Sequence, residues 1–452
     1  MGRHAAGESF LHAYCRYGDA DTLYCYAADQ DHLRHFKEKV RGINESTKCN
    51  WIPRSAWSGL TEPGLLFLPG PDLTNLAWLR QTKDLAGFSM CGITHTTASH
   101  AAMDAIGSLL TAPLQPWDAL ICTSQAVKTT VDKILSDYAD YLQHRFSMPK
   151  KPSTPVQLPV IPLGINCDSF SKHQEEGLRL QWRSKLAIDS HAVVALFVGR
   201  LSYHAKSHPQ PMFLALEAAS KRTGKAIHLI MAGWAHNQAI QDDFVSAAKI
   251  LCPSVQVTFL DGRKESVRKT IWYAADFFIS LSDNIQETFG LTPVEAMSAG
   301  LPVVISNWNG YRETVRDGVN GYLIDTCMPK PNEAPSLAPQ YADGTLSYDR
   351  YIGYVSQTTA VDIRQCSQAC AALVDDAALR AKLSAAAREH ARQTYDWRVI
   401  IPQYLRLFEQ LSSARAQARG KQEMPSNRFN PLRQDPTVLF SHYATHHLAA
   451  DT

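Results

Sequence analysis

The sequence predicts an α/β protein with two doubly wound parallel sheets in tandem. Apolar runs of strand length alternate with helical patterns through the first third of the chain, which favours parallel βαβ units. A second series of the same kind begins near residue 193, after a polar stretch that follows Gly164. With 452 residues, the chain is also too long for a single hydrophobic core.

The first series defines an N-terminal domain over residues 1–165. Its predicted strands are TLYCYAA, GLLFLPG, FSMCGITH, ALICTS and VQLPVIPLGI. We expect helices over 97–110 and 124–146, where the pattern changes from strand-like to helical.

The second series defines a C-terminal domain over residues 166–395. Its predicted strands are VVALFVGRL, AIHLIMAG, VQVTFLDG, DFFISLSD, PVVISN and GYLID. The helices between them are expected near 208–222, 235–251, 264–274, 293–299 and 311–316. Two such sheets in tandem predict a cleft between the domains, at the carboxyl ends of their strands.

Three segments fall outside this alternation. Residues 327–360 are Pro-rich and too long for an ordinary connection, so we interpret them as an insertion in the second domain. Residues 396–413 carry an amphipathic helical pattern. Residues 414–452 are a polar linker and a short tail.

Composition excludes several classes of function. A net charge of +2 gives no broad basic field of the kind that binds nucleic acid. No apolar run is long enough to span a membrane, and the N-terminus lacks a signal pattern. The ten cysteines lack CxxC spacing and are expected to be thiols. We therefore expect a cytoplasmic protein, with peripheral contact at the inner face of the membrane left open.

The segment from Gln286 to Glu295 carries the strongest chemical signal. Glu287 and Glu295 lie eight positions apart around a glycine turn, directly after an apolar run that predicts a buried strand. Carboxylates accept hydrogen bonds from sugar hydroxyls. The backbone N–H groups of the Phe289-Gly290-Leu291 turn would open the following helix, where an anion is favoured. The combination suits a nucleotide sugar.

Each of these acids also has an ordinary structural interpretation. Thr292, Pro293 and Glu295 fit a helix start with a capping box, in which Thr292 is the N-cap. Glu287 would, taken alone, be a solvated loop charge.

Two cations and a histidine are predicted to face the same cleft. Arg200 ends a strand and Lys206 follows six residues later, and two fixed cations can stabilise a diphosphate leaving group. His95 directly follows the third strand candidate and could hydrogen-bond a donor-sugar hydroxyl or the acceptor. Singly, each of the three is more often a surface or structural residue.

Weaker signals lie near the ends of the chain. Gly2 and Gly7 precede a helical pattern and could form a backbone-lined floor for a ligand, although no strand precedes them. Asp19 and Asp21 form a DxD pattern in a polar turn away from the cleft. We therefore expect no metal and no cofactor beyond the substrate.

Ordered motifs give the chain a family resemblance. The motifs are ITHT, WDALICTSQAV, VIPLGINCDSF, VGRLSYHAK, LIMAG, TFLDG, SDNIQETFGLTPVEAMSAGLPVV, NGYRETVRDGVNGYLI and YDW. They resemble those of the retaining nucleotide-sugar glycosyltransferases with two Rossmann-like domains, the GT-B fold of glycosyltransferase family 4 or group 1 type. The resemblance spans roughly 85–410 and is strongest at 193–325. The sequence departs from it in lacking a strand before the glycine loop and in the unusual LSYHA between Arg200 and Lys206.

The resemblance implies a role for each candidate residue. Arg200 and Lys206 would hold the donor diphosphate, and Glu295 would accept from the ribose hydroxyls. Glu287 would contact the transferred sugar, with His95 beside it and backbone contacts from the Phe289-Gly290-Leu291 turn. The segment after Trp397 would cross back onto the first domain.

The resemblance also implies the reaction. A UDP-, GDP- or ADP-linked sugar would be transferred, with retained configuration and without a metal, to a hydroxyl of a glycan, a lipid-linked acceptor or a small molecule, as in polysaccharide biosynthesis. The leaving phosphate would take the acceptor's proton. Two alternatives stay open: a phosphorylase or epimerase of the same architecture, and a catalytically silent nucleotide-sugar-binding or scaffold protein.

Overall fold

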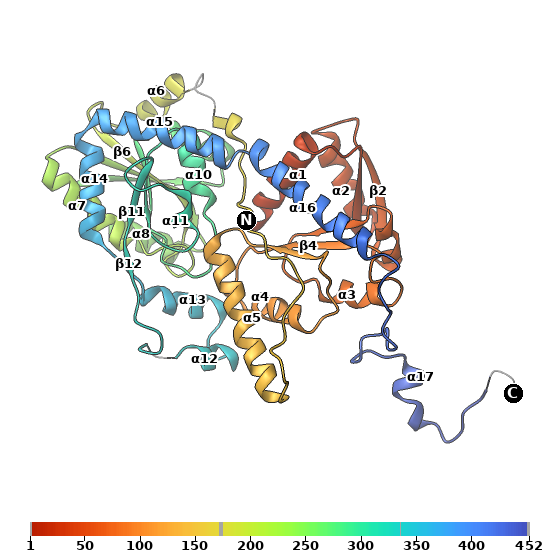
Figure 1. The fold of residues 1–452 in the computed structure, drawn as a ribbon. Helices are drawn as coiled ribbons and strands as arrows, with labels where there is room; N and C mark the ends of the chain where they lie inside the picture. Colours follow the sequence, from red (N-terminus) through yellow and green to blue (C-terminus); the bar gives the residue numbers. More distant parts are fainter. Residues whose placement is uncertain (1, 171–174, 335, 450–452) are drawn as a thin grey trace.

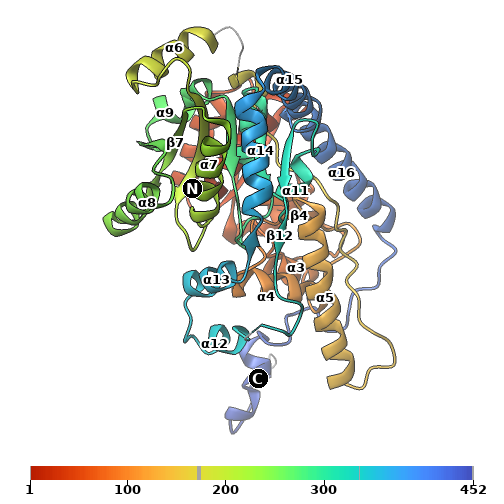
Figure 2. The same ribbon diagram turned by 90° about the vertical axis from the view of Figure 1, so that its left-hand side faces the viewer.

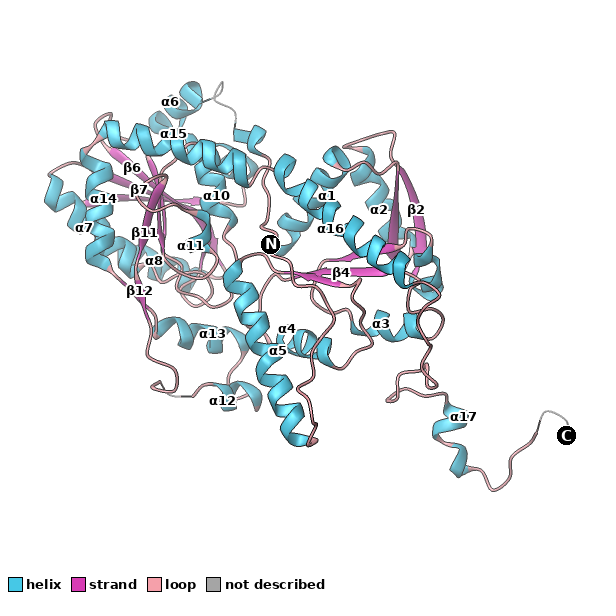
Figure 3. Cartoon of the chain, in the orientation of Figure 1, coloured by secondary structure: helices cyan, strands magenta, loops and turns pink. Residues whose placement is uncertain are grey.

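The computed structural model describes residues 2–170, 175–334 and 336–449, and it has the expected α/β architecture (Figure 1). Two groups of parallel strands lie side by side, one formed from residues 22–121 and one from residues 193–324. Helices surround both groups (Figure 3). The predicted boundary at residue 165 stays a prediction.

The first half contains two small sheets in place of one continuous sheet. Strands β1 (Thr22–Ala27) and β2 (Lys48–Pro53) pair in parallel, and β3 (Leu65–Leu68), β4 (Ser89–Ile93) and β5 (Ala119–Ile121) form a separate parallel sheet. Strand β2 was not predicted, because KCNWIP has neither a continuous apolar run nor a clear alternation.

The predicted strand VQLPVIPLGI is wrong. The structure gives this segment only isolated bridges, which include Gln157 to Ala119 and Val160 to Cys122. Pro159 and Pro162 have no N–H to donate, so a regular ladder of hydrogen bonds cannot continue through them.

In the first half, helices form at the predicted positions near 97–110 and 124–146 and at the start of the chain, and two further helices, α2 (Gln30–Arg41) and α3 (Thr74–Gln81), were not predicted. The predicted ones are α1 (Gly2–Tyr17), α4 (His100–Gly107) and α5 (Gln125–Arg145). Asp29, Ser99 and Ser124 are N-caps whose side chains accept from the backbone N–H group three residues ahead. Ser99 and Ser124 thus fix the starts of α4 and α5, each a short loop after β4 and β5.

The second half is a six-stranded parallel sheet with the order β11-β10-β9-β6-β7-β8. The strands are β6 (Val193–Leu201), β7 (Ile227–Ala235), β8 (Val255–Asp261), β9 (Phe277–Ser280), β10 (Val303–Ser306) and β11 (Gly321–Ile324), all at predicted positions. This order is that of a doubly wound nucleotide-binding sheet, in which the chain changes direction between β6 and β9.

Helices cover both faces of this sheet. Along β6, Val193, Ala195 and Phe197 pack into one core with α7 (Gln210–Thr223), α8 (Gln238–Leu251) and α14 (Ile363–Asp375). Val194 and Leu196 point the other way, into a core with α6 (Glu175–Lys185), α10 (Leu291–Ser298) and α15 (Ala377–Thr394). The remaining helices of the sheet are the short α9 (Glu265–Thr270) and α11 (Tyr311–Thr314).

The expected insertion is a separate small unit on a two-stranded stem. Strands β12 (Thr326–Cys327) and β13 (Ala360–Val361) pair antiparallel, and between them lie α12 (Ala338–Ala342) and α13 (Tyr348–Gln357). Figures 1 and 2 show both helices below the six-stranded sheet, beside α4 of the first half.

Helix α16 (Trp397–Ala418) carries the chain back to the first half (Figure 1). Its buried face, which includes Trp397, Ile400 and Tyr404, packs against Cys91 and Ile93 of β4. The helix ends five residues beyond the predicted 413. The tail after it contains only α17 (Pro436–Leu439) and a 3-10 turn within the described residues. Among the described helices, none has an apolar stretch long enough to cross a bilayer.

Candidate active site

The candidate residues gather where the six-stranded sheet changes direction. Lys206 lies in the loop after β6, and Glu287 lies in the loop after β9. These strands are neighbours in the sheet, although β9 starts at Phe277, 76 positions after the end of β6 at Leu201. Ligands of doubly wound sheets bind at this edge, because the loops separate there and leave a crevice.

Lys206 and Glu287 form a partly buried ion pair. The Lys206 Nζ to Glu287 Oε2 distance is 2.5 Å, and the two side chains are 16% and 17% exposed. The Lys206 ammonium also donates to the Tyr311 hydroxyl at 3.2 Å. Burial alone would lower the pKa of Lys206, but the negative charge of Glu287 outweighs it and raises this pKa above its usual value. Both groups are therefore charged at neutral pH.

The Glu287 carboxylate is held in the ionised form. Burial would raise its pKa, yet the charge of Lys206 and the backbone N–H groups of Phe289 and Thr288 lower it below the usual value. One of the N–H groups expected to face an anion, that of Phe289, thus serves Glu287 in this conformation. The N–H groups of Gly290 and Leu291 donate to no residue that the structure describes, and they stay available at the start of α10.

Two glycines let the loops after β9 and β10 approach closely. Gly290 has φ +90°, and a Cβ there would lie 2.2 Å from the Tyr311 ring. A Cβ at Gly310 would lie 2.1 Å from the Thr288 carbonyl oxygen. Only glycine fits at either position, and this close approach brings the Tyr311 hydroxyl to Lys206.

The capping box predicted at Thr292 is wrong. Helix α10 begins at Leu291 with Gly290 as its N-cap, and no side chain caps it. The Thr292 hydroxyl is buried and makes no hydrogen bond with a described residue. Glu295 lies in the second turn, so its carboxylate is not used as a cap.

Glu295 is a half-buried acid near the ion pair. Burial raises its pKa to about 7, while the positive charges of Arg268 and Lys206 oppose that rise. No hydrogen bond to its carboxylate is made by the described residues. An acid that is desolvated, near cations and without a donor is well suited to accept from ligand hydroxyls.

Arg200 lies apart from the ion pair. It is exposed at the end of β6, and its guanidinium donates weakly to the Ala205 carbonyl at 3.4 Å. The structure thus brings Lys206, Glu287 and Glu295 together, while Arg200 stays at the solvent side of the same loop.

His95 is connected to the site through Thr288. The Thr288 hydroxyl donates to the His95 carbonyl at 3.0 Å, and the Ser124 hydroxyl donates to the Thr288 carbonyl at 2.8 Å. Nearby, Glu313 accepts from the backbone N–H groups of Gln125 and Ala126 at 2.7 and 2.8 Å. The first half therefore meets the second directly beside Glu287.

Sequence reasoning missed four residues that shape this site: Tyr311, Thr288, Asn309 and Arg268. Tyr311 and Asn309 stand in the NGYRE motif directly after a predicted strand, which was an available signal. The Asn309 side chain donates to the Glu287 carbonyl, and the backbone of Asn309 has φ +44°. Thr288 and Arg268 gave no signal beyond their positions in loops and short helices.

The weaker signals lie elsewhere. Gly2 and Gly7 are inside helix α1 and do not form the expected loop floor. Asp19 and Asp21 lie in the turn before β1. The described residues contain no group of three or more His, Cys, Asp or Glu side chains placed to hold a metal ion.

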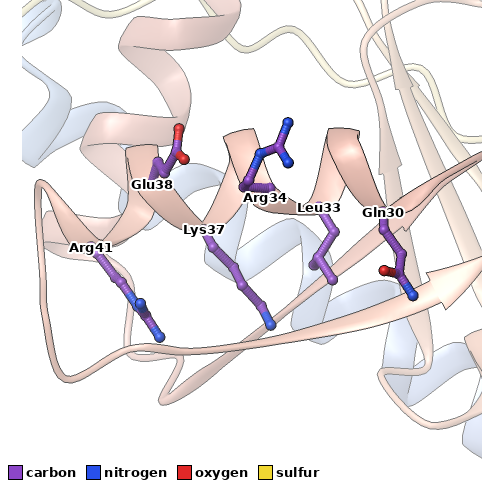
Figure 4. Close-up of a pocket in the computed structure, with 6 residues that line it drawn as sticks. All are labelled: Gln30, Leu33, Arg34, Lys37, Glu38 and Arg41. Atoms are coloured by element: carbon purple, nitrogen blue, oxygen red, sulfur yellow. The ribbon is translucent and has the colours of Figure 1, made fainter.

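A shallow hollow of about 330 Å³ lies on α2, and it shares no residue with the candidate site (Figure 4). Lys37 and Arg41 point to the same side of the helix there, whereas Glu38 points away from them. The whole lining is Gln30, Leu33, Arg34, Lys37, Glu38 and Arg41.

Comparison with known sequences identifies the segment that carries the site. The sequence model of the family described as "Glycosyl transferases group 1" matches residues 179–333. D-inositol 3-phosphate glycosyltransferase of Mycobacterium sp. (strain KMS) is 32% identical over 176 residues, which are 38% of this chain and 36% of that protein. The Mycobacterium tuberculosis (strain F11) protein of the same name is 30% identical over 205 residues, or 44% and 39%. The match thus spans less than two fifths of these relatives.

Comparison with solved structures extends the likeness to the fold of nearly the whole chain. Anabaena Alr3699/HepE in complex with UDP gives a TM-score of 0.56 at 16% identity, covering 90% of this chain and 96% of that one. Sucrose-phosphate synthase from Thermosynechococcus elongatus gives 0.51 at 17% identity, covering 85% and 79%. Residues 179–333 are therefore similar to the group 1 glycosyl transferases, and the chain has the GT-B fold.

Proposed function

We propose that the protein is a metal-independent retaining hexosyltransferase that moves a sugar from a nucleotide diphosphate sugar to a hydroxyl acceptor. The observation that carries this proposal is the cluster of Lys206, Glu287 and Glu295 at the switch point of a group 1 glycosyltransferase segment. The name of the mycobacterial relatives supports glycosyl transfer. The structure of Anabaena Alr3699/HepE in complex with UDP-glucose supports a UDP-linked donor.

Lys206 is the residue proposed to stabilise the leaving group. Negative charge develops on the diphosphate as the glycosidic bond breaks, and a fixed cation in a partly desolvated site stabilises it. Arg200 lies on the same loop and is free enough in solvent to turn toward the phosphates. The N–H groups of Gly290 and Leu291 add donors at the start of α10.

The two acids are proposed to hold the rest of the donor. When the Lys206 ammonium binds the diphosphate, its ion pair with Glu287 weakens, and the Glu287 carboxylate can accept hydrogen bonds from hydroxyls of the transferred sugar. Glu295, which has no donor among the described residues, would accept from the ribose. His95 would lie beside the sugar, where the first half, residues 1–165, is proposed to bind a carbohydrate or lipid-linked acceptor.

Retention is proposed to proceed without a protein nucleophile. Retaining glycosidases need two carboxyl groups on opposite sides of the bond, one of them free to attack. Glu287 is instead tied to Lys206. We infer that the leaving phosphate accepts the acceptor's proton on the side of departure. The contacts between the halves beside Glu287 would help to exclude water during this step.

The test begins with binding of nucleotides by the intact chain. We expect UDP and UDP-sugars to raise the melting temperature, and we expect consumption of a UDP-sugar in the presence of EDTA. Lys206→Ala and Glu287→Ala should abolish consumption while the protein stays folded, and Lys249→Ala, on the exposed face of α8, should not.

Two results would contradict the proposal in different ways. Binding without consumption of any donor would favour the silent nucleotide-sugar-binding alternative. No binding of any nucleoside diphosphate or its sugar would remove both hypotheses.

A further inference from the structure

The insertion between β12 and β13 touches all three loops that carry the candidate site. Its helices α12 and α13 lie beside α4 of the first half and below the sheet of the second half in both views (Figures 1 and 2). The loops are those after β4, β6 and β9, which hold His95, Lys206 and Glu287 respectively.

Toward the first half, the contact is aromatic. The Tyr341 ring of α12 stacks on the His100 imidazole, with ring centres 3.5 Å apart, and its hydroxyl accepts from the His100 backbone N–H at 3.3 Å. The Tyr351 ring of α13 also stacks on Tyr341, with ring centres 4.3 Å apart. The start of α4 is thus held by a stack of three rings.

Toward the second half, the contact is a small apolar core. Ile352 of α13 is fully buried with Ala98, from the loop after β4, and Ala205, from the loop after β6. Helix α13 can approach this closely because Gly353 has no side chain, and a Cβ there would lie 3.0 Å from the Cβ of His204.

A hydrogen bond extends the contact to the residue before Glu287. The Tyr348 hydroxyl donates to the Gln286 side-chain oxygen at 3.4 Å, and the Gln286 amide donates in turn to the Ala205 carbonyl. One side chain of the insertion therefore reaches the loop of Glu287 and the loop of Lys206 together.

We propose that Tyr341 and Tyr348 are positioning residues for glycosyl transfer. This inference rests on the proposed function. Through Tyr341, Tyr348, Tyr351 and Ile352, which we call the strap, the insertion holds the loop of His95 against the loops of Lys206 and Glu287. The acceptor side and the donor side of the site are thereby fixed in one arrangement.

The strap differs in kind from the direct contacts beside it. Thr288 joins His95 and Ser124 through hydrogen bonds alone, and water replaces such bonds at little cost when the halves separate. Stacked rings and a buried isoleucine lose their contact without replacement. Two domains of one chain are otherwise expected to move relative to each other.

The main test replaces Tyr341 and measures which fraction of the consumed donor is transferred to the acceptor and which fraction is hydrolysed by water. We expect Tyr341→Ala to reduce kcat for transfer about tenfold and to raise the share of donor lost to hydrolysis, with the donor KM little changed. Tyr341→Phe keeps the stack and should stay close to the unchanged protein. Tyr348→Phe, which removes only the hydroxyl, should show a smaller effect in the same direction.

Tyr354→Ala is the matched control, because this tyrosine belongs to the same insertion, on α13, but is 44% exposed and outside the apolar core. If Tyr341→Ala and Tyr354→Ala give the same kcat and the same division of the donor, the positioning role is wrong.

Hydrogen exchange separates this inference from the proposed function. In the intact chain without ligand, Tyr341→Ala should speed amide exchange over residues 95–102, where the His100 N–H loses its acceptor, and Tyr354→Ala should not. Unchanged exchange over 95–102 would overturn the strap even in an active protein. Absence of turnover by the unchanged protein would count against the proposed function. Amide hydrogen exchange over residues 95–102 would still test the contact between the insertion and α4.

Discussion

Two ion pairs, one in each half of the molecule, show how the same chemistry serves different purposes. Arg80 and Asp118 form a two-pronged pair at 2.7 and 2.6 Å, and both side chains are 0% exposed. Asp118 also accepts from the backbone N–H groups of Met90 and Gln115, and Arg80 donates to the Phe88 carbonyl. Both carboxylate oxygens and both terminal guanidinium nitrogens are hydrogen-bonded within the protein, and only the buried Arg80 Nε has no partner among the described residues.

The pair of Lys206 and Glu287 is less complete. A single Nζ to Oε2 contact joins the side chains, and each is about one sixth exposed. An ammonium with spare donors beside an accessible carboxylate can exchange its partner for a ligand, whereas the pair of Arg80 and Asp118 cannot. We infer that the pair of Arg80 and Asp118 stabilises the fold, whereas the pair of Lys206 and Glu287 is available to bind a ligand.

The largest expected effect in this comparison is on folding, at Arg80. Arg80→Ala leaves Asp118 charged and buried with only two backbone donors, which should cost about 3–5 kcal/mol of unfolding free energy. Denaturation by urea measures it. A loss below about 1 kcal/mol would contradict the structural role that we assign to this pair.

The next effect is on turnover, at Lys206. Lys206→Met should lower kcat for donor consumption at least about 100-fold, the usual loss when one charge-stabilising donor is removed. Because the pair is partly hydrated, its effect on unfolding should be smaller than that of Arg80→Ala. Steady-state kinetics of Lys206→Met and urea denaturation of Lys206→Met and Arg80→Ala test the comparison. A larger loss of unfolding free energy in Lys206→Met than in Arg80→Ala would contradict it.

A third effect is on the pH dependence of stability, at Glu295. With a pKa of about 7 in the folded state and a usual value of 4.5, this acid binds a proton in the folded chain that the unfolded chain has released between these pH values. Its contribution to stability is therefore present below about pH 4.5 and is lost as the pH rises to about 7. The loss should be on the order of 2 kcal/mol.

Glu295→Gln should flatten this part of the profile, measured by urea denaturation at pH 5 and pH 7.5. Asp283, whose pKa burial also raises to about 7, should keep a decline of the same sign in the variant. An unchanged slope in Glu295→Gln would show that Glu295 is hydrated in solution.

The smallest effect concerns the exposed acid Glu313, which caps α5 across the boundary between the halves. Glu313→Ala should cost about 1 kcal/mol, as for the loss of an N-cap. Differential scanning calorimetry checks it, and Glu389→Ala, an acid of α15, serves as the comparison. A cost equal to that of Arg80→Ala would show that the boundary carries far more of the stability than the pair at Arg80.

The sequence predicts every strand of the six-stranded sheet in the second half, whereas in the first half it misses β2 and adds one strand that does not form, for physical reasons. Strands buried on both faces, such as VVALFVGRL, give continuous apolar runs that are visible locally. Lys48–Pro53 is fully buried only at Ile52, and Pro159 and Pro162 interrupt an otherwise apolar segment. The hydrophobic pattern of a segment predicts a strand only where all residues of that strand are buried to a similar degree.

The site is predictable at the level of loops and not of contacts. The positions of Lys206 and Glu287 after strands follow from the apolar runs before them. That Tyr311 and Thr288 contact them depends on which strands are neighbours and on how the halves meet, and neither is encoded within a window of residues. Thr292 shows the opposite failure, because the helix already begins at Leu291, ahead of the favourable capping pattern, where Gly290 packs closely on Tyr311.

The return of α16 to the first half has a consequence for how the chain is made. Phe67 of β3 and Ile93 of β4 are covered by Tyr404 and Ile400, which are synthesised more than 300 residues later. During synthesis, the N-terminal strands therefore leave the ribosome with an apolar face that helix α1 covers only in part, through Phe10 on Phe67, and that α16 completes in the finished structure. A fragment ending near residue 165 would retain that exposed face, and we expect it to aggregate unless residues 397–411 are supplied as a second chain.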